Sequence, residues 1–167
     1  MRAMYLIGDD GMKYIFDSGP LINLFRHYYP ERFPSLWEKF YALVSDGKII
    51  SVKEVYNEID SREDALANWA KDQKDKFFSP STVEEFRFVT EIFKVRHFQA
   101  MIRNKERLQG KPVADPFVIA RAKIFNCPVV TTEALKDNAA GIPNVCEHFS
   151  IPYIDLEGFM KQEGWTF

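Results

Sequence analysis

The chain has 167 residues, of which 46% are hydrophobic and 15% aromatic, and its formal net charge is -2 at pH 7. This length predicts one domain over residues 1–167 with a substantial core, and the composition excludes a disordered protein. The net charge argues against a protein coated in positive charge for non-specific DNA binding, although a local basic strip is enough to bind nucleic acid.

Along the chain, short apolar runs alternate with segments in which apolar residues recur at helical spacing. This pattern predicts short strands that alternate with helices. Residues 1–11 read as a non-native or disordered extension, with Met12 as the natural start. Alternation of this kind is typical of an α/β domain with a mostly parallel sheet covered on both faces. The predicted elements are a strand over 13–16, helices from 18 and from 34, a strand over 48–51, a helix over 52–59, a charged helical segment over 62–78, helices over 83–93 and 115–125, strands over 127–133 and 151–156, and a short terminal helix.

Four acidic residues fall where the carboxyl edge of such a sheet would gather them. Asp17 ends the first strand, Glu133 follows the third by two threonines, Asp115 begins the preceding helix, and Glu58 lies in the helix after the second strand. Sites in open parallel sheets form at the carboxyl ends of the strands, so these side chains are expected to converge. Clustered carboxylates repel one another unless a cation binds, and oxygen ligands suit Mg²⁺ or Mn²⁺. The cluster therefore predicts metal-dependent phosphodiester chemistry.

Each acid also has a simpler explanation when it is taken alone. Asp17 and Asp115 are both favourable helix caps, since aspartate is a preferred residue at that position. Glu133 suits a solvated turn, and Glu58 pairs with Glu54 one turn earlier as the wet side of an amphipathic helix. Only the joint placement of the four residues favours a functional site.

The segments YIFDSGPLI, IISVKEVYNEI, VADPFVIARA and VVTTEA resemble, in order and spacing, the acidic motifs of the PIN-domain family. The nearest group is the VapC-like toxin ribonucleases of bacterial toxin–antitoxin modules, and the resemblance covers most of the chain from Met12. It implies a three-layer α/β/α fold with a mostly parallel central sheet of about five strands. It also implies an endoribonuclease that hydrolyses RNA phosphodiester bonds with Mg²⁺ or Mn²⁺ and that is paired with an antitoxin protein.

The resemblance assigns roles by motif position. Glu58 is chosen over Glu54 because the helix of the family reads apolar-x-x-Glu-apolar, as VYNEI does. The family usually has Asp where this chain has Glu133, and the next acid, Asp137, comes four residues later. The longer side chain of Glu133 is expected to shift or weaken a second metal site. The implied metal ligands are Asp17, Glu58, Asp115 and Glu133, and the implied catalytic residues are these four with Ser18 and Thr131, which orient carboxylates and waters.

A basic segment precedes the third acid directly. Residues 94–111 hold six Lys and Arg against one acid, Glu106. Arg103, Lys105 and Arg107 are the best candidates to bind RNA phosphates beside the metal site. The alternative is a solvated helix end, which is the more usual place for a run of charges.

The cysteines, the apolar segments and the N-terminus bear on the partners and the cellular compartment of the protein. The two cysteines form no zinc motif or disulfide framework, and no apolar run approaches the ~20 residues of a membrane-spanning helix. A signal-peptide pattern is missing at the N-terminus, which predicts a cytoplasmic protein without membrane association. Trp37, Phe40 and Tyr41 are candidates for a homodimer or antitoxin interface, although such aromatic residues more often belong to the core.

Two alternative functions differ from a ribonuclease. A HAD-type phosphatase also has a strand that runs into an aspartate, but it needs a second aspartate where this chain has Gly19, so this alternative is discounted. The stronger alternative is a catalytically weak PIN-like scaffold that binds RNA or protein. Glu133, where the family usually has Asp, is compatible with this alternative. Cleavage of RNA that depends on a divalent cation would separate the nuclease from the scaffold.

Overall fold

The structure is a computed structural model that describes residues 14–102 and 113–167. The predicted extension over residues 1–11 lies outside the described residues. Five strands form one sheet in the order β3-β2-β1-β4-β5, and every neighbouring pair is parallel. The strands are β1 (Tyr14–Phe16), β2 (Ile49–Val52), β3 (Phe78–Ser79), β4 (Val129–Val130) and β5 (Tyr153–Ile154).

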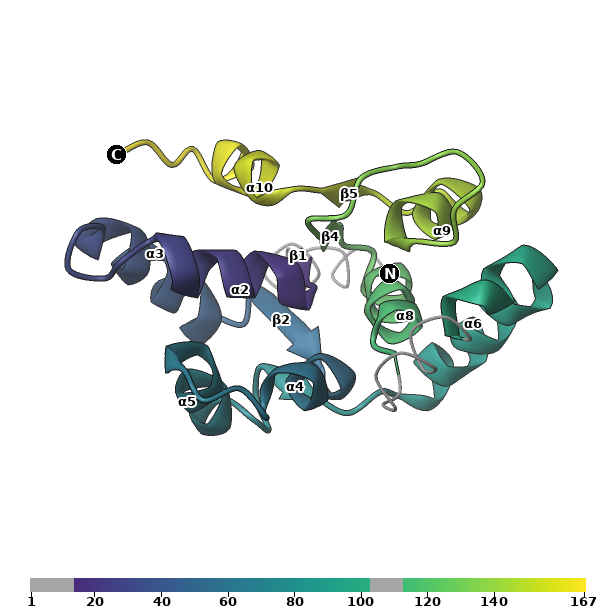
Figure 1. Cartoon of the computed structure of the whole chain (residues 1–167), viewed down its shortest axis with the longest axis horizontal. Helices are drawn as coiled ribbons and strands as arrows, with labels where there is room; N and C mark the ends of the chain where they lie inside the picture. The colour runs from purple at the N-terminus through teal and green to yellow at the C-terminus, as the bar shows by residue number, and fades with distance from the viewer. Residues whose placement is uncertain (1–13, 103–112) are drawn as a thin grey trace, which may run out of the picture.

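Helices connect the strands and cover both faces of the sheet, because parallel neighbours require crossover connections. Figure 1 shows them on either side of the central strands. The helices are α2 (Ser18–His27), α3 (Pro34–Ser45), α4 (Lys53–Ile59), α5 (Ala65–Asp72), α6 (Val83–Lys94), the 3₁₀ helix η1 (Arg96–Gln99), α8 (Asp115–Phe125), α9 (Ile142–Phe149) and α10 (Leu156–Gln162).

The central strand β1 is apolar and buried on both faces. On one face, the ring of Phe16 packs against Phe40 of α3 and Phe159 of α10, with centroids 6.3 and 5.1 Å apart. On the other face, α8 contacts β1, β2 and β4 (Figure 1). Helix α8 is buried around most of its circumference because α6 covers its far side. The prediction of a three-layer α/β/α fold with a parallel sheet of five strands is confirmed.

The prediction of a helical segment over 62–78 is wrong over much of that range. Helix α5 covers only Ala65–Asp72, and its cap Asp64 accepts a hydrogen bond from the Ala67 N–H at 3.0 Å. The chain then enters the edge strand β3, because Phe77 and Phe78 pack their rings against Trp69 in the core. A strand of two residues is too short to show a periodicity in the sequence. Helix α9 and the 3₁₀ helix η1 were likewise not predicted.

The aromatic residues of α3 divide between core and surface. Trp37 and Phe40 are buried, as the core interpretation expects, whereas Tyr41 is 42% exposed. Both cysteines are buried, and burial raises the pKa of Cys127 to about 11 and that of Cys146 to about 12. They are therefore inert as nucleophiles at neutral pH. No helix within residues 14–102 and 113–167 has the length and apolar content to cross a membrane.

Candidate metal centre

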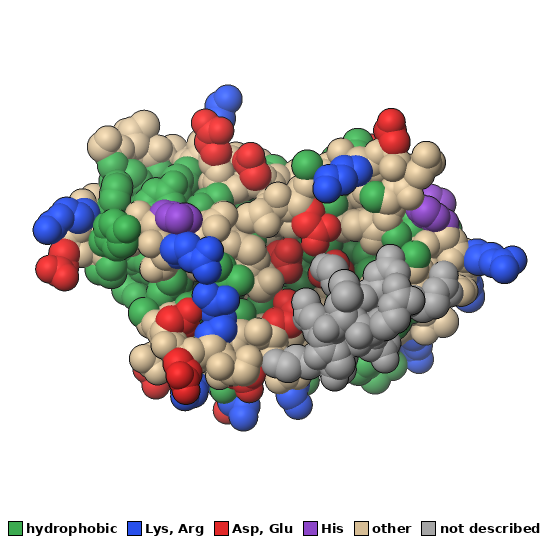
Figure 2. Space-filling view, in the orientation of Figure 1, with side chains coloured by type: hydrophobic (Ala, Val, Ile, Leu, Met, Phe, Trp, Pro, Cys, Tyr) green, Lys and Arg blue, Asp and Glu red, His purple; other side chains and the backbone are tan. Residues whose placement is uncertain are grey.

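Three acidic side chains from distant parts of the chain meet at the carboxyl edge of the sheet. Asp17 follows β1, Asp115 is the first residue of α8, and Glu133 lies three residues after β4. One carboxylate oxygen from each lies within 4.8 Å of those of the other two. Figure 2 shows acidic side chains gathered near the centre of this face of the molecule. Oxygen atoms at this spacing match the preference of hard divalent cations for carboxylate ligands.

Asp17 is buried and does not serve as a conventional helix cap. It occupies the cap position of α2, yet its carboxylate makes no capping hydrogen bond. Instead, Asp17 Oδ2 accepts a hydrogen bond from Thr131 Oγ1 at 3.1 Å. Asp17 therefore occupies the cap position of α2 without a side-chain capping hydrogen bond, and its carboxylate lies with those of the other acids.

The surroundings of Asp17 favour its protonated form. Burial is the main cause, and the negative charge of Asp115 is the next, with smaller contributions from Glu133 and Glu58. The Ser18 backbone N–H opposes them, but the pKa of Asp17 is still raised to about 8. Without a cation, one carboxylate in the cluster therefore holds a proton at neutral pH. A buried acid of this kind beside other acids is typical of a functional site.

Asp115 is also not a helix cap. Ala114 occupies the cap position of α8, and Asp115 is the first helical residue, followed by Pro116. Its side chain is only 3% exposed, at the end of the helix where backbone N–H groups favour a negative charge. The capping explanation is wrong here, because the helix begins one residue earlier than a cap at Asp115 requires.

Glu133 and Glu58 each accept a hydrogen bond from a backbone N–H at the start of a helix. Glu133 Oε1 accepts a hydrogen bond from the N–H of Ile142, the first residue of α9, at 3.0 Å. A Cβ atom on Gly141 would lie 2.7 Å from Glu133 Oε1, so only glycine leaves room for this contact. Glu58 Oε2 accepts a hydrogen bond from the Ala114 N–H at 3.2 Å, directly beside Asp115. Glu133 is thus half-buried and anchored, which overturns its interpretation as a solvated turn residue.

Thr131 joins two members of the cluster. Its hydroxyl donates to Asp17 and accepts from the Glu133 backbone N–H at 3.2 Å. Ser18 is the half-buried first residue of α2. Of the two glutamates in α4, Glu58 contributes charge at Asp17, whereas Glu54 lies among the charges of Arg121 and Glu85. Glu58 is therefore the better candidate for the site.

Comparison with known proteins places the chain in a family. Residues 14–167 match the family described as a domain of unknown function, DUF4411. The chain belongs to this family. A search of the curated proteins gives no match. Among solved structures, a chain of VapBC2 from Rickettsia felis, bound to a DNA fragment from the promoter, is similar with 11% identity and a TM-score of 0.45 over 86% of this chain and 98% of that chain.

The sequence does not reveal two buried residues of this DUF4411 protein that belong to a hydrogen-bond network ending at Phe16, the residue before Asp17. Ser51, in β2, donates a hydrogen bond to the carbonyl oxygen of Phe16, and Arg121 donates to the carbonyl oxygen of Ser51. The only signal in the sequence is an arginine within the apolar run VIARA. The RNA-binding candidates Arg103, Lys105 and Arg107 lie outside the described residues.

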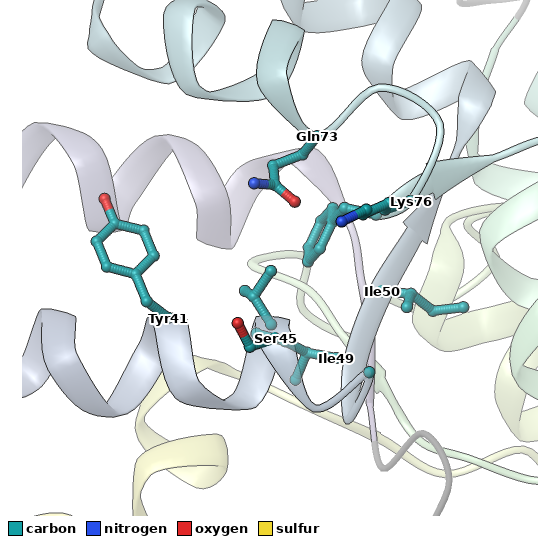
Figure 3. A pocket seen from close by; sticks show the side chains of 9 residues that line it. Tyr41, Ser45, Ile49, Ile50, Gln73 and Lys76 are labelled. Carbon is teal, nitrogen blue, oxygen red and sulfur yellow. The ribbon is translucent and has the colours of Figure 1, made fainter.

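A pocket of about 420 Å³ lies elsewhere on this DUF4411 protein. It is lined by Tyr41 and Ser45 at the end of α3, Ile49 at the start of β2, and Gln73 and Lys76 after α5 (Figure 3). These residues mark the amino end of β2, opposite the edge that carries the acids. Although pockets often mark small-molecule sites, the carboxylate cluster is the better candidate because its chemistry is more specific.

Gly19 is expected to be essential for the close packing beside Asp17. A Cβ atom at this position would lie 3.0 Å from Cγ2 and 3.2 Å from Cβ of Thr132, and closer still to its hydroxyl. Rotation of Thr132 cannot relieve the contact with its own Cβ. We expect Gly19→Ala to lower the free energy of unfolding by about 1–3 kcal/mol, measured by urea denaturation. Unchanged or raised stability of Gly19→Ala would contradict the packing argument, because alanine is otherwise favoured over glycine within a helix.

Proposed function

We propose that this DUF4411 protein is a metal-dependent endoribonuclease that hydrolyses RNA phosphodiester bonds with Mg²⁺ or Mn²⁺. The observation that carries the proposal is the meeting of Asp17, Asp115 and Glu133 oxygens within 4.8 Å at the carboxyl edge of a parallel sheet. RNA as substrate follows from the resemblance of the four acidic segments to PIN-domain motifs. The same resemblance supports a role as the toxin of a toxin–antitoxin module.

The side chains of the cluster have distinct tasks in this proposal. Asp17, Asp115 and Glu133 would hold the cation, with Glu58 as a direct or water-mediated ligand. A bound divalent cation supplies an activated water and neutralises charge on the departing oxygen of the phosphodiester. Thr131 keeps the Asp17 carboxylate oriented through its hydrogen bond, and Ser18 is proposed to orient a ligand or a water from the start of α2.

The partners proposed are an RNA substrate and an antitoxin protein, with a homodimer as a further assembly. Tyr41 is the exposed aromatic residue of α3 that remains available for such an interface. Arg103, Lys105 and Arg107 are proposed to bind the RNA backbone. Substitution of Arg103 or Arg107 by Ala should weaken RNA affinity and its salt dependence if these residues contact phosphates.

The decisive experiment is cleavage of a labelled structured RNA by the purified protein with Mg²⁺, with Mn²⁺ and with EDTA. We expect cleavage that EDTA abolishes and that Asp115→Asn reduces by at least ~100-fold, more than removal of an outer-shell partner typically costs. Asp137→Asn is the matched control, because Asp137 is an exposed acid outside the cluster. Full activity of Asp115→Asn, or cleavage that persists in EDTA, would contradict the proposal.

A second candidate function is a scaffold that binds RNA or protein with little catalysis. It is favoured by one specific contact, the hydrogen bond that commits Glu133 Oε1 to the Ile142 N–H. The same assay distinguishes the two functions, since RNA binding without cleavage in either metal favours the scaffold.

The effect of the Glu133 side-chain length on stability can also be tested. Glu133→Asp withdraws the carboxylate from Ile142 and should free the amino end of α9. We expect the free energy of unfolding to fall by about 0.5–2 kcal/mol, the usual cost of a lost helix-capping contact. Chemical denaturation in EDTA measures this effect without the contribution of a cation. Unchanged stability would show that Glu133 is not anchored to α9.

A further inference from the structure

Arg121 is a buried charge that the proposed chemistry does not use. It lies in α8 six residues after Asp115, and its side chain is 2% exposed. Its guanidinium forms an ion pair with Glu85 of α6, with Nη2 and Oε1 2.9 Å apart, and Glu85 is itself fully buried. Burying such a pair costs desolvation energy that the pair often does not recover. Its presence is therefore poorly explained by stability alone.

The other donors of Arg121 reach the carboxyl ends of two strands. Nη1 donates to the carbonyl oxygen of Ser51 at 2.8 Å and to the hydroxyl of Ser79 at 2.8 Å. Nη2 donates to the carbonyl oxygen of Pro80 at 2.8 Å. These contacts fix β2 and β3 against α8 at the edge of the sheet that carries the acids. The rigid planar fork of guanidinium suits this set of acceptors, and a lysine ammonium cannot span it.

Ser51 extends this network to β1, the strand that Asp17 follows. Its hydroxyl is buried and donates to the carbonyl oxygen of Phe16 at 2.5 Å. Phe16 is the residue directly before Asp17. Ser51 also lies in β2, which leads into helix α4 and Glu58. One guanidinium therefore connects the segments that position Asp17, Glu58 and Asp115.

We propose that Arg121 is a positioning residue for the metal centre. Its contacts hold β2 and β3 against α8 and, through Ser51, hold the end of β1, which sets the spacing between Asp17 and Asp115. Arg121 itself touches neither the cation nor the substrate. This inference rests on the proposed function for the identity of the site, but its own claim concerns cation affinity and not cleavage.

The experiment compares two serines of the same network in the full-length protein. Ser51→Ala removes the hydroxyl that reaches β1, and Ser79→Ala removes a hydroxyl that accepts from Arg121 on the edge strand β3, which carries none of the acids. Calorimetric titration with MnCl₂ alone measures the affinity, and thermal unfolding in EDTA measures the stability. We expect Arg121→Lys to weaken Mn²⁺ binding about 10–100-fold, in the range of outer-shell partners, and Ser51→Ala about 10-fold, at the lower end of that range. Ser79→Ala should stay within about twofold of wild type.

The outcomes separate this inference from the proposed function. Wild-type Mn²⁺ affinity in Ser51→Ala overturns the inference, and so does an equal loss in Ser51→Ala and Ser79→Ala, which would indicate general loosening. Should Arg121→Lys fail to fold, the serine pair still decides. The expected ranking of affinities in a protein that cleaves no RNA would support the positioning role and overturn the proposed activity. Mn²⁺ binding that Asp17→Asn leaves intact would overturn both.

Discussion

Asp17→Asn is expected to abolish cation-dependent cleavage and, in the same protein, to stabilise the metal-free fold at alkaline pH. The activity should fall by at least ~100-fold because the substitution removes a carboxylate that we propose as a central metal ligand. The stability should rise because an ionised carboxylate at this position is buried among three other acids. Asparagine fills nearly the same space without the charge. Functional residues that destabilise the fold in this way are common at active sites.

The sign of the stability effect with pH follows from the raised pKa. Burial and the charge of Asp115 raise the pKa of Asp17 from its ordinary value of 3.8 to about 8 in the folded protein. Between these values the folded state binds more protons than the unfolded state, so wild-type stability falls as the pH rises from about 4 to about 8. Asparagine does not titrate, so the advantage of the variant should be small at pH 5 and largest at pH 9.

Thermal unfolding in EDTA at pH 5, 7 and 9 measures the effect. We expect Asp17→Asn to unfold about 3–8 °C above wild type at pH 9, which corresponds to about 1–3 kcal/mol for a chain of this size. Asp137→Asn should show no such pH-dependent gain. Adding Mn²⁺ should raise the transition of wild type and leave that of Asp17→Asn nearly unchanged. An Asp17→Asn variant less stable than wild type at pH 9 in EDTA would refute the charge argument.

Cation affinity itself is expected to depend steeply on pH. As a proposed ligand, Asp17 must lose its proton when a cation binds, because ligands bind in the deprotonated form. The affinity for Mn²⁺ should therefore rise up to about tenfold per pH unit below pH 8 and level off above it. Titration calorimetry in two buffers of different ionisation enthalpy would show about one proton released per cation at pH 7.

Asp17→Asn is the control for this measurement, since any cation it still binds should displace no proton from this position. An affinity that does not change between pH 6 and pH 8, with no proton released, would show that Asp17 is already ionised in the metal-free protein. Cleavage rates at subsaturating Mn²⁺ should follow the same profile, and saturating Mn²⁺ should reduce the dependence on pH. This difference separates a proton that competes with the cation from a proton that the chemical step needs.

The positions of the acids within the predicted elements could be read from the sequence because they depend on local features. A short apolar run that ends in Asp17 predicts a strand with an acid at its carboxyl end, and Asp115-Pro116 predicts the start of a helix. In a parallel sheet, strand ends meet at one edge, so the approach of Asp17, Asp115 and Glu133 followed from element order alone. Their assignment as metal ligands stays a prediction.

Only the tertiary structure decided the remaining features, because they depend on contacts between distant segments. β3 is two residues long and exists because Phe77 and Phe78 find the core beside β2, which no local period reveals. The position of Arg121 within an apolar helix did not predict that Glu85 and the ends of β2 and β3 would surround its guanidinium. Capping could not be excluded for Asp17 until the structure directed its carboxylate to Thr131. The sequence by itself determined the α/β class and the edge of the sheet that carries the acids, because hydrophobic periodicity and strand polarity are local. The partners of each side chain were decided only by the tertiary structure, because they depend on which segments meet in space.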